Sequence, residues 1–279
     1  MQPIYELGGN GPLIHLAVAN GFPPQTYKPL LTPFTEHYRV ACLLPHALWP
    51  GELPPKKWVN WHDGLAQDLI AGLRAYNLRD MIGIGHSFGG VATVIAAIAE
   101  PERFRAVILL DPTILPQSYL WMVAFLRRLG IRISHSLAEH AENRRTDFPS
   151  VAEAYTYFRD KRLFANWPDE TVRCYAESLI PAPGRAGLTL AWPRDWEAYY
   201  FRTLYAGVWR ELPKLRGKMP LLLVRGENSN TLYPKAAARI RQILPELAYA
   251  EIAGHGHLFP LSAPEETRRV IIDWLAKQS

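Results

Sequence analysis

The chain has 279 residues, of which 48% are hydrophobic, and it carries a formal net charge of +5. This length suits one large α/β domain with an insertion, and the apolar content is ample for its core. The arginines are scattered and no basic run is interleaved with aromatic residues, which argues against a nucleic-acid partner.

The first part of the chain alternates apolar runs with segments of helical periodicity. Strands are predicted at residues 4–7, 13–19, 38–44, 81–84 and 105–110, and helices at residues 58–76 and 91–99. The continuous apolar run at 13–19 is typical of an interior parallel strand. Strands that alternate with helices predict right-handed crossovers and a mostly parallel sheet with helices on both faces.

The pattern changes in the middle of the chain. Between residues 116 and 205 strand-like runs vanish, and helical segments rich in Trp, Tyr, Phe and Arg replace them. After this block, strands are predicted at 220–224 and 248–252, and helices at 233–244 and 264–277. We therefore expect a first core segment (1–115), a helical insertion over the carboxyl edge of the sheet (116–205) and a second core segment (206–279).

The segment Gly85-His86-Ser87-Phe88-Gly89 reads Gly-x-Ser-x-Gly, between a predicted strand and a predicted helix. Strand, sharp turn and helix form the context of a nucleophile elbow. Gly85, Gly89 and Gly90 remove side chains where strand and helix close on each other. The helix dipole beside the Ser87 hydroxyl favours developing negative charge. Ser87 is therefore the predicted nucleophile, and the alternative is a glycine-rich turn with an incidental serine.

Three segments together resemble the cap-bearing branch of the α/β-hydrolase superfamily. They are the elbow, Asn20-Gly21-Phe22-Pro23 where relatives usually carry His-Gly-x-Pro, and residues 254–261, which read GHGHLFPL. The resemblance covers nearly the whole chain outside the insertion. It implies an α/β-hydrolase fold whose inserted helices form a cap over the active site, and it says much less about substrate, because this fold hosts many chemistries.

A serine nucleophile needs a histidine base within hydrogen-bond reach. His255 and His257 follow the last predicted strand, where the resemblance places the base. Relatives carry Gly-His, an apolar pair and Pro, and His257 matches that register. His257 is therefore the predicted base, and His255 is expected to bond to backbone. His86 is expected to point to the opposite side of the turn, into the core.

The carboxylate that orients the base is where the sequence departs from the usual pattern. Relatives often supply an aspartate where this chain has Asn230, and an amide cannot hold the charge. Some haloalkane dehalogenases take the acid from the end of the strand after the elbow helix, where this chain has Asp111. Asp111 is the predicted acid, while Glu227, or no carboxylate at all, stays open.

Attack on a carbonyl creates an oxyanion that requires preorganised donors. The backbone N–H of Phe88, directly after the nucleophile, is one expected donor. The resemblance implies the N–H of Phe22 as the second, although Asn20 replaces the usual histidine there. The Phe22 side chain is expected either to line the acyl pocket or to pack under the cap.

These residues predict a serine hydrolase that cleaves a small, largely apolar carboxylic ester or related acyl compound through an acyl-enzyme. Cleavage of a carbon–carbon bond or a lactone on the same triad is an alternative. A non-catalytic receptor for a small ligand is another, favoured by the departures at Asn20 and Asn230. Dehalogenase and epoxide hydrolase chemistry is disfavoured, because both need a carboxylate where Ser87 stands.

No cofactor or metal is expected. Cys42 and Cys174 lie far apart and supply no paired-cysteine zinc motif, and no His-Glu-x-x-His segment occurs. No signal peptide is visible, and no apolar run approaches the ~20 residues of a membrane helix. We expect a cytoplasmic protein with no membrane span and a small-molecule substrate. The sequence does not indicate an oligomeric state.

Overall fold

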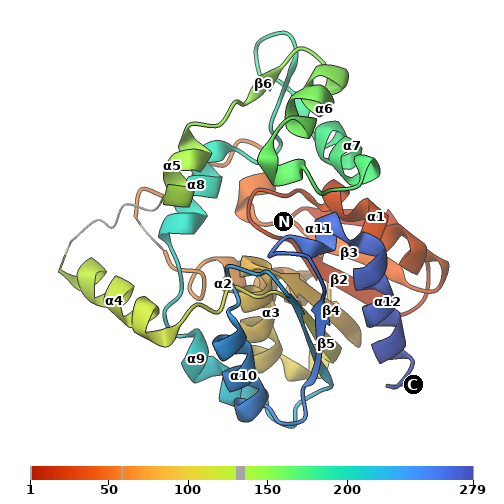
Figure 1. Ribbon diagram of the computed structural model, residues 1–279, viewed down its shortest axis with the longest axis vertical. Helices are drawn as coiled ribbons and strands as arrows, with labels where there is room; N and C mark the ends of the chain where they lie inside the picture. Colours follow the sequence, from red (N-terminus) through yellow and green to blue (C-terminus); the bar gives the residue numbers. More distant parts are fainter. Residues whose placement is uncertain (1, 58, 130–135, 279) are drawn as a thin grey trace.

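A computed structural model describes residues 2–57, 59–129 and 136–278 (Figure 1). Within these ranges a seven-stranded sheet has the order β1-β3-β2-β4-β5-β9-β10. Its strands are β1 (Ile4–Gly8), β2 (Leu13–Ala17), β3 (Arg39–Leu43), β4 (Met81–His86), β5 (Phe104–Leu110), β9 (Leu221–Gly226) and β10 (Ala248–Ile252). Only β1 pairs antiparallel to its neighbour in this described sheet. The predicted mostly parallel α/β architecture is confirmed, and each core strand lies within two residues of its predicted bounds.

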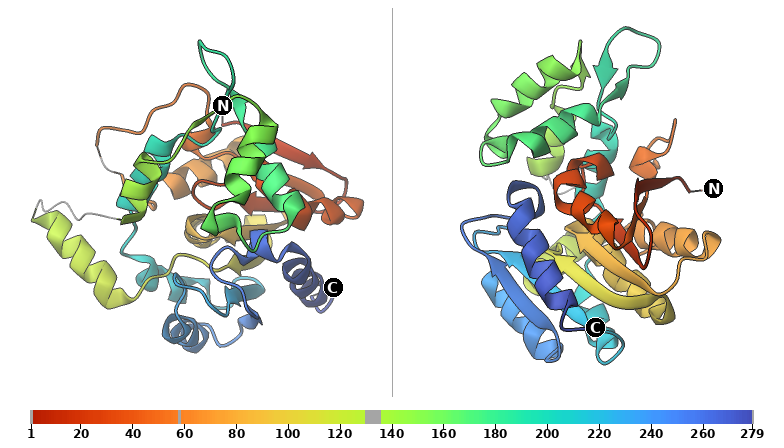
Figure 2. Two further views of the ribbon diagram at one scale, coloured as in Figure 1. Left: turned by 45° about the horizontal axis from the view of Figure 1, so that its top comes forward. Right: turned by 90° about the vertical axis from the view of Figure 1, so that its right-hand side faces the viewer.

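Helices cover both faces of this sheet (Figures 1 and 2). The core helices are α1 (Lys28–Leu31), α2 (Leu65–Ala75), α3 (Phe88–Ala99), α9 (Val208–Glu211), α10 (Pro234–Ile243), α11 (Phe259–Ser262) and α12 (Pro264–Leu275). On one face α2 packs against α3, and on the other α1 packs against α12. Helices on both faces are the arrangement that right-handed crossovers produce when the strand order runs in both directions along the sheet.

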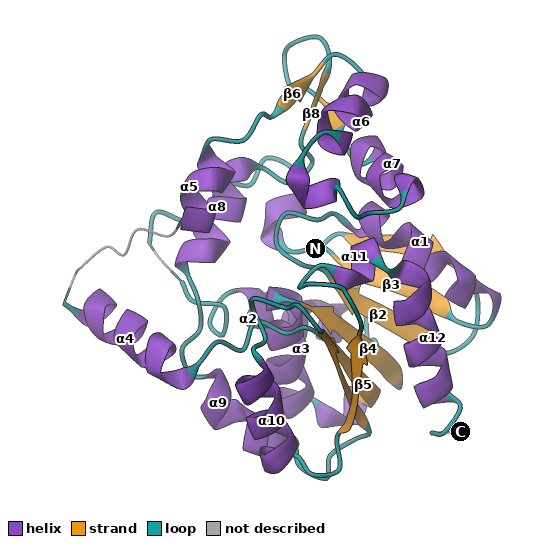
Figure 3. Ribbon diagram, in the orientation of Figure 1, coloured by secondary structure: helices purple, strands orange, loops and turns teal. Residues whose placement is uncertain are grey.

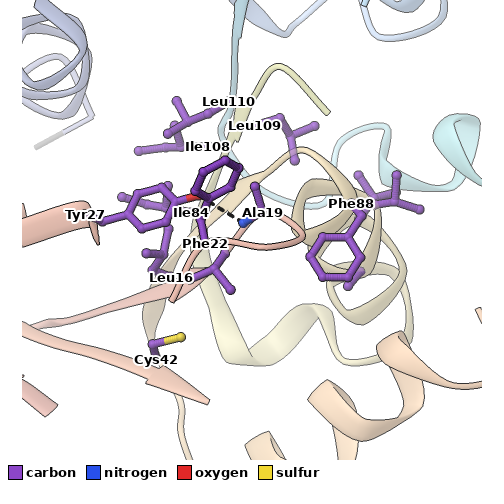
Figure 4. Close-up of a cluster of buried hydrophobic side chains, with 14 of the residues drawn as sticks. Leu16, Ala19, Phe22, Tyr27, Cys42, Ile84, Phe88, Ile108, Leu109 and Leu110 are labelled. Atoms are coloured by element: carbon purple, nitrogen blue, oxygen red, sulfur yellow. Dashed lines mark hydrogen bonds between the residues drawn. The ribbon is translucent and has the colours of Figure 1, made fainter. Parts of the chain in front are cut away.

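The hydrophobic core lies between the central strands and these helices. Every residue of β2 and β4 is buried, which explains why both read as continuous apolar runs rather than alternating ones. Figure 4 shows Leu16, Ile84 and Ile108, from three neighbouring strands, in one buried cluster. Burying a side chain of this size stabilises the fold by roughly 1.5–3 kcal/mol.

The helix predicted for residues 58–76 begins later, at Leu65. Trp58 lies outside the described residues, and residues 61–64 form a turn. The side-chain oxygen of Asn60 accepts hydrogen bonds from the backbone N–H groups of His62 and Asp63. Such a side-chain acceptor competes with helix formation, so the regular helix starts only after this turn.

The inserted block, residues 116–205, is mainly helical (Figure 3). Its helices are α4 (Gln117–Arg128), α5 (Ser136–Glu142), α6 (Val151–Arg159), α7 (Asp169–Glu177) and α8 (Arg194–Arg202). The expectation that strands vanish here is wrong in one part. A small sheet of order β6-β8-β7 joins β6 (Asp147–Phe148), β7 (Ile180–Pro181) and β8 (Leu188–Thr189). Strands of two residues carry no periodicity that a sequence pattern could reveal.

The inserted block contacts the sheet at the carboxyl end of β2. The side chain of Asn20 donates to the backbone oxygen of Glu197, in α8, at 2.9 Å. The ring of Phe22 lies 5.7 Å from that of Trp167, centroid to centroid. Among the helices of the described segments, each is too short or too polar to span a lipid bilayer.

Candidate active site

Ser87 occupies a sharp turn between β4 and α3. Its φ of 59° and ψ of −124° are unfavourable for a residue with a side chain, and such strain is characteristic of functional turns. A Cβ at Gly89 would lie 2.4 Å from the carbonyl oxygen of Ala17, and one at Gly85 would lie 2.6 Å from the Cα of Gly90. The predicted need for glycine around the serine is therefore confirmed.

Residues from distant parts of the chain meet at the Ser87 hydroxyl. The Nε2 atom of His257 lies 2.9 Å from the Oγ of Ser87. The Nδ1 atom of the same histidine lies 2.6 Å from the Oδ2 of Asp111. Ser87 is 8% exposed and Asp111 is fully buried. The structure thus brings together the predicted nucleophile, base and acid in one continuous line of hydrogen bonds. Because a carboxylate only accepts, the Nδ1 of His257 carries the proton and its Nε2 accepts from the serine.

The carboxylate of Asp111 is held by more than the histidine. Its Oδ1 accepts from the backbone N–H of Gly226 at 3.1 Å, and its Oδ2 accepts from the hydroxyl of Ser229 at 2.5 Å. The Ser229 oxygen in turn accepts from the backbone N–H groups of Thr231 and Leu232. Burying a charge without such partners would be very costly, so this set of donors makes a buried carboxylate tenable.

The two other positions considered for the acid lie elsewhere. Glu227 is exposed, and its Oε2 accepts from the backbone N–H of Gly254 at 2.7 Å. Asn230 is also exposed, and its side-chain oxygen accepts from the hydroxyl of Thr231 at 3.5 Å. Across the described residues, Asp111 is the one carboxylate hydrogen-bonded to His257.

His86 is fully buried behind the elbow, as expected for a core residue. Its Nδ1 lies 2.7 Å from the hydroxyl of Tyr27, and its Nε2 donates to the carbonyl oxygen of His257 at 3.0 Å. Burial, with a smaller contribution from the nearby His257, lowers the pKa of His86 to about 3. The ring is therefore neutral near pH 7. The other loop histidine, His255, pairs with the hydroxyl of Ser262 at 2.8 Å rather than with backbone.

The two expected oxyanion donors differ in their surroundings. The N–H of Phe88 lies in the first turn of α3, where backbone donors have no acceptor within the helix. The N–H of Phe22 donates to the carbonyl oxygen of Ala19 at 3.2 Å. Figure 4 shows Ala19 and Phe22 side by side, and Phe88 belongs to the same buried cluster. The Phe22 ring packs under the inserted block, against Trp167 and Tyr175, which agrees with the second of its two expected roles.

Two polar residues at the site have no counterpart in the sequence-based predictions. The Oγ1 of Thr113 lies 3.1 Å from the Oγ of Ser87, and the hydroxyl of Ser229 bonds to Asp111. Ser229 adjoins Asn230, the position where relatives often carry the acid. The sequence thus points to this segment, but not to Ser229 as a partner of Asp111. For Thr113 the only signal was its place two residues after Asp111.

The inserted block forms polar contacts above the loop of residues 19–22. Arg144 forms an ion pair with Glu197, and it also donates to the hydroxyl of Tyr175 at 2.5 Å. The carboxylate of Glu197 lies so near Gly21 that a Cβ there would be 3.1 Å from it. Asn20, which stands where relatives usually carry histidine, thus belongs to a contact between this loop and α8.

The described residues contain no group of three or more His, Cys, Asp or Glu side chains arranged to hold a metal ion. Cys42 and Cys174 are both buried and free. Burial raises the pKa of the Cys42 thiol, which keeps it protonated and unreactive.

The sequence is similar to that of known hydrolases. It matches the model of the alpha/beta hydrolase family over residues 13–270. It is 25% identical over 298 residues to bifunctional epoxide hydrolase 2 of Sus scrofa, covering 96% of this chain and 52% of that protein. It is 26% identical over 218 residues to 2-(acetamidomethylene)succinate hydrolase of Mesorhizobium japonicum, covering 75% of this chain and 69% of that protein. The chain thus spans about half the length of the first of these relatives.

Solved structures agree with this relationship. The crystal structure of E-2-(acetamidomethylene)succinate hydrolase matches with a TM-score of 0.72 at 22% identity, covering 98% of this chain and 94% of that one. A thioesterase domain from the curacin biosynthetic pathway matches with a TM-score of 0.67 at 16% identity, covering 96% and 94%. Likeness at these identities reports the fold. Together with the family match over residues 13–270, it establishes that this chain belongs to the alpha/beta hydrolase family.

Proposed function

We propose that the chain is a serine hydrolase that cleaves a small, largely apolar carboxylic ester or related acyl compound. The observation that carries this proposal is the continuous line from Asp111 through His257 to Ser87, with contacts of 2.6 and 2.9 Å. A nucleophile, a base within hydrogen-bond reach and a group that orients the base are the parts that acyl transfer requires.

In the acylation step, the Oγ of Ser87 attacks the substrate carbonyl and its proton passes to the Nε2 of His257. The Asp111 carboxylate stabilises the imidazolium that forms. The negative charge on the former carbonyl oxygen is accepted by the N–H of Phe88. The N–H of Phe22 is the second donor, and it must be shared with, or released from, the oxygen of Ala19. His257 then protonates the leaving group.

Water completes the cycle. It attacks the acyl carbon and gives a proton to His257, and the acid product leaves as Ser87 recovers its proton. No electron transfer is involved. The second donor matters here as well, because losing one oxyanion donor typically lowers the rate by about 10²–10³.

We further propose that the inserted block, residues 116–205, acts as a cap over this site, between core segments 1–115 and 206–279. Its aromatic side chains meet the core beside the nucleophile. The Phe88 ring lies 6.1 Å from that of Trp192 and 5.0 Å from that of Tyr200, centroid to centroid. Apolar walls with few polar groups are typical of sites for small organic substrates. The largely apolar acyl group stays a prediction.

The alternatives stand differently against these observations. Carbon–carbon and lactone cleavage use the same three residues, so they stay open as reaction types. A non-catalytic receptor would not need the Ser87 hydroxyl aligned with a hydrogen-bonded His257–Asp111 pair. Although an epoxide hydrolase is among the relatives, Ser87 stands where that chemistry needs a carboxylate. The cytoplasmic location stays a prediction.

A fluorophosphonate probe tests the proposal directly. We expect it to label the folded protein at Ser87, and peptide mapping should show no label in the Ser87→Ala variant. p-Nitrophenyl esters of several chain lengths should give turnover that the same variant lacks. Folded wild-type protein that neither reacts with the probe nor turns over any ester, yet binds a small ligand, would favour the receptor alternative.

A further inference from the structure

The hydroxyl of Thr113 is a second polar group in contact with the Ser87 oxygen, besides the base. Its Oγ1 lies 3.1 Å from the Oγ of Ser87. We propose that Thr113 is a further catalytic residue, whose hydroxyl donates a hydrogen bond to the Ser87 oxygen and speeds release of the acyl group from the enzyme. This inference rests on the proposed serine hydrolase function, because it concerns the acyl-enzyme.

The direction of this hydrogen bond follows from the neighbouring protons. The carboxylate of Asp111 accepts from the Nδ1 of His257, which leaves the Nε2 as an acceptor. The single proton of the Ser87 hydroxyl is therefore directed to that Nε2, at 2.9 Å. Since Ser87 has no second proton to give, the contact at 3.1 Å is made by the proton of Thr113.

The backbone fixes Thr113 in this position. The N–H of Thr113 donates to the carbonyl oxygen of Ser87 at 3.0 Å, and the N–H of Ser87 donates to the carbonyl oxygen of Leu110 at 3.1 Å. Between them Asp111 adopts a φ of 43°, which turns the chain after β5 around the elbow. One short segment thus supplies the acid and a hydroxyl donor to the same nucleophile.

The donor has its clearest effect on deacylation. In the acyl-enzyme the Ser87 oxygen is the alcohol oxygen of an ester, and the proton of Thr113 withdraws electron density from it. Water adds to the acyl carbon while its proton passes to His257. The C–Oγ bond then breaks, its electron pair stays on Oγ, and His257 returns the proton to that oxygen. Thr113 keeps its own proton throughout and stabilises the charge that develops on Oγ.

In acylation the same hydrogen bond has opposing effects. It reduces the electron density of the attacking oxygen in the free enzyme, and it stabilises any alkoxide character in the transition state. These contributions largely cancel. Removal of the Thr113 hydroxyl should therefore slow deacylation by about three- to tenfold, the size expected for one hydroxyl hydrogen bond. Acylation should change by less than about twofold.

Three variants separate this role from simple packing. Thr113→Val removes the hydroxyl at nearly constant shape and keeps the backbone N–H, while Thr113→Ser keeps the hydroxyl and removes the methyl group. Thr267→Val is the matched control, because the Thr267 hydroxyl is also buried and makes one hydrogen bond, to the oxygen of Ala263 in the distant α12 region. Stopped-flow kinetics with p-nitrophenyl acetate gives the acylation rate, and intact-mass spectrometry follows the decay of the acetyl-enzyme.

We expect slower decay of the acetyl-enzyme in Thr113→Val, near-normal decay in Thr113→Ser, and no change in Thr267→Val. The rate of fluorophosphonate labelling should stay within about twofold in all three. Unchanged decay in Thr113→Val, or equal slowing in Thr113→Ser, would overturn the role of Thr113 and leave the proposed function intact. A wild-type protein that forms no acetyl-enzyme and resists the probe would overturn both.

Discussion

The imidazole of His86 donates from its Nε2 to the main-chain oxygen of His257 at 3.0 Å. On its other side the Nδ1 accepts from the hydroxyl of Tyr27, which itself accepts from the N–H of Ala19 at 3.0 Å (Figure 4). This buried chain links the loop that carries the proposed base, His257, to the loop that carries the expected oxyanion donor. The residue before the proposed nucleophile thus fixes the positions of two loops that approach Ser87 from different strands.

Tyr27→Phe tests the energy of this chain. The change leaves the N–H of Ala19 and the Nδ1 of His86 buried without partners, and each such group costs about 1–3 kcal/mol. We expect the free energy of unfolding to fall by about 2–6 kcal/mol, measured by urea denaturation at pH 7. Tyr233→Phe is the control, because Tyr233 is 45% exposed. Equal stability of the two variants would show that the chain contributes nothing.

Asp111→Asn tests the assignment of the acid. An amide at this position cannot balance the charge of the imidazolium, and its N–H₂ group favours the wrong tautomer of His257. We expect kcat on p-nitrophenyl esters to fall by about 10⁴, as for the corresponding change in a serine protease triad. Glu227→Gln and Asn230→Ala should stay within about threefold, because neither side chain bonds to His257. A large loss in Glu227→Gln with little loss in Asp111→Asn would reverse the assignment.

The acid could be predicted from the sequence for a reason of topology. Asp111 directly follows β5, which pairs with β4, and the carboxyl ends of parallel neighbours lie at one edge of the sheet. Apolar runs and the elbow motif located both strands, so any polar residue just beyond them was a candidate. Strand order thus places Asp111 beside the proposed nucleophile, whereas the choice of Asp111 and His257 among the candidates came from the resemblance to the α/β-hydrolase superfamily.

What the sequence could not show depends on side-chain geometry. Thr113 and Ser229 are ordinary loop residues in the sequence, and only the fold shows which atoms their hydroxyls reach. The sequence also does not show that the N–H of Phe22, the expected oxyanion donor, donates a hydrogen bond to the carbonyl oxygen of Ala19. The late start of α2 after Asn60 and the strands β6, β7 and β8 also depend on local hydrogen bonds that no periodicity reveals.

Gly89→Ala tests the close approach of α3 to β2. The new Cβ would lie 2.4 and 2.5 Å from the carbonyl oxygens of Ala17, the last residue of β2, and Val18, directly after it, and this backbone cannot move without disturbing the sheet. Overpacking of this kind costs about 1–3 kcal/mol or more, and we expect the melting temperature to fall by several degrees. Labelling of Ser87 should slow as well, because the elbow must shift.

Gly184→Ala serves as the comparison for Gly89→Ala. Gly184 has a φ of 69° with open space around its Cβ position, so only the backbone strain of about 1–2 kcal/mol remains. This variant should therefore lose less stability and keep its rate of labelling. A Gly89→Ala protein that melts no lower than Gly184→Ala and labels normally would show that the elbow tolerates a side chain.

The buried histidines predict how stability varies with pH. Burial lowers the pKa of His15 to about 4, and burial with the nearby His257 lowers that of His86 to about 3. In the folded protein both pKa values lie below the value of about 6.5 expected for an unfolded histidine. As the pH falls, the unfolded chain therefore binds more protons than the folded one. Their full stability is thus present above pH 6.5 and is lost progressively toward pH 4, by about 1.4 kcal/mol per pH unit for each ring. His46, whose pKa is raised by its hydrogen bond to Asp68, acts in the opposite sense.

His15→Gln isolates one of these contributions. The Nε2 of His15 accepts from the N–H of Leu43, and a glutamine oxygen can accept in its place without taking up a proton. Urea denaturation at pH 7.0, 6.0 and 5.0 should show a shallower loss of stability in this variant, by about 1.4 kcal/mol per pH unit below 6.5. The variant is expected to be less stable at pH 7, so the slope is the quantity that decides. If the free energy of unfolding fell with pH at the same rate in wild type and variant, His15 would take up its proton equally in the folded and unfolded states. That result would contradict the lowering of its pKa by burial.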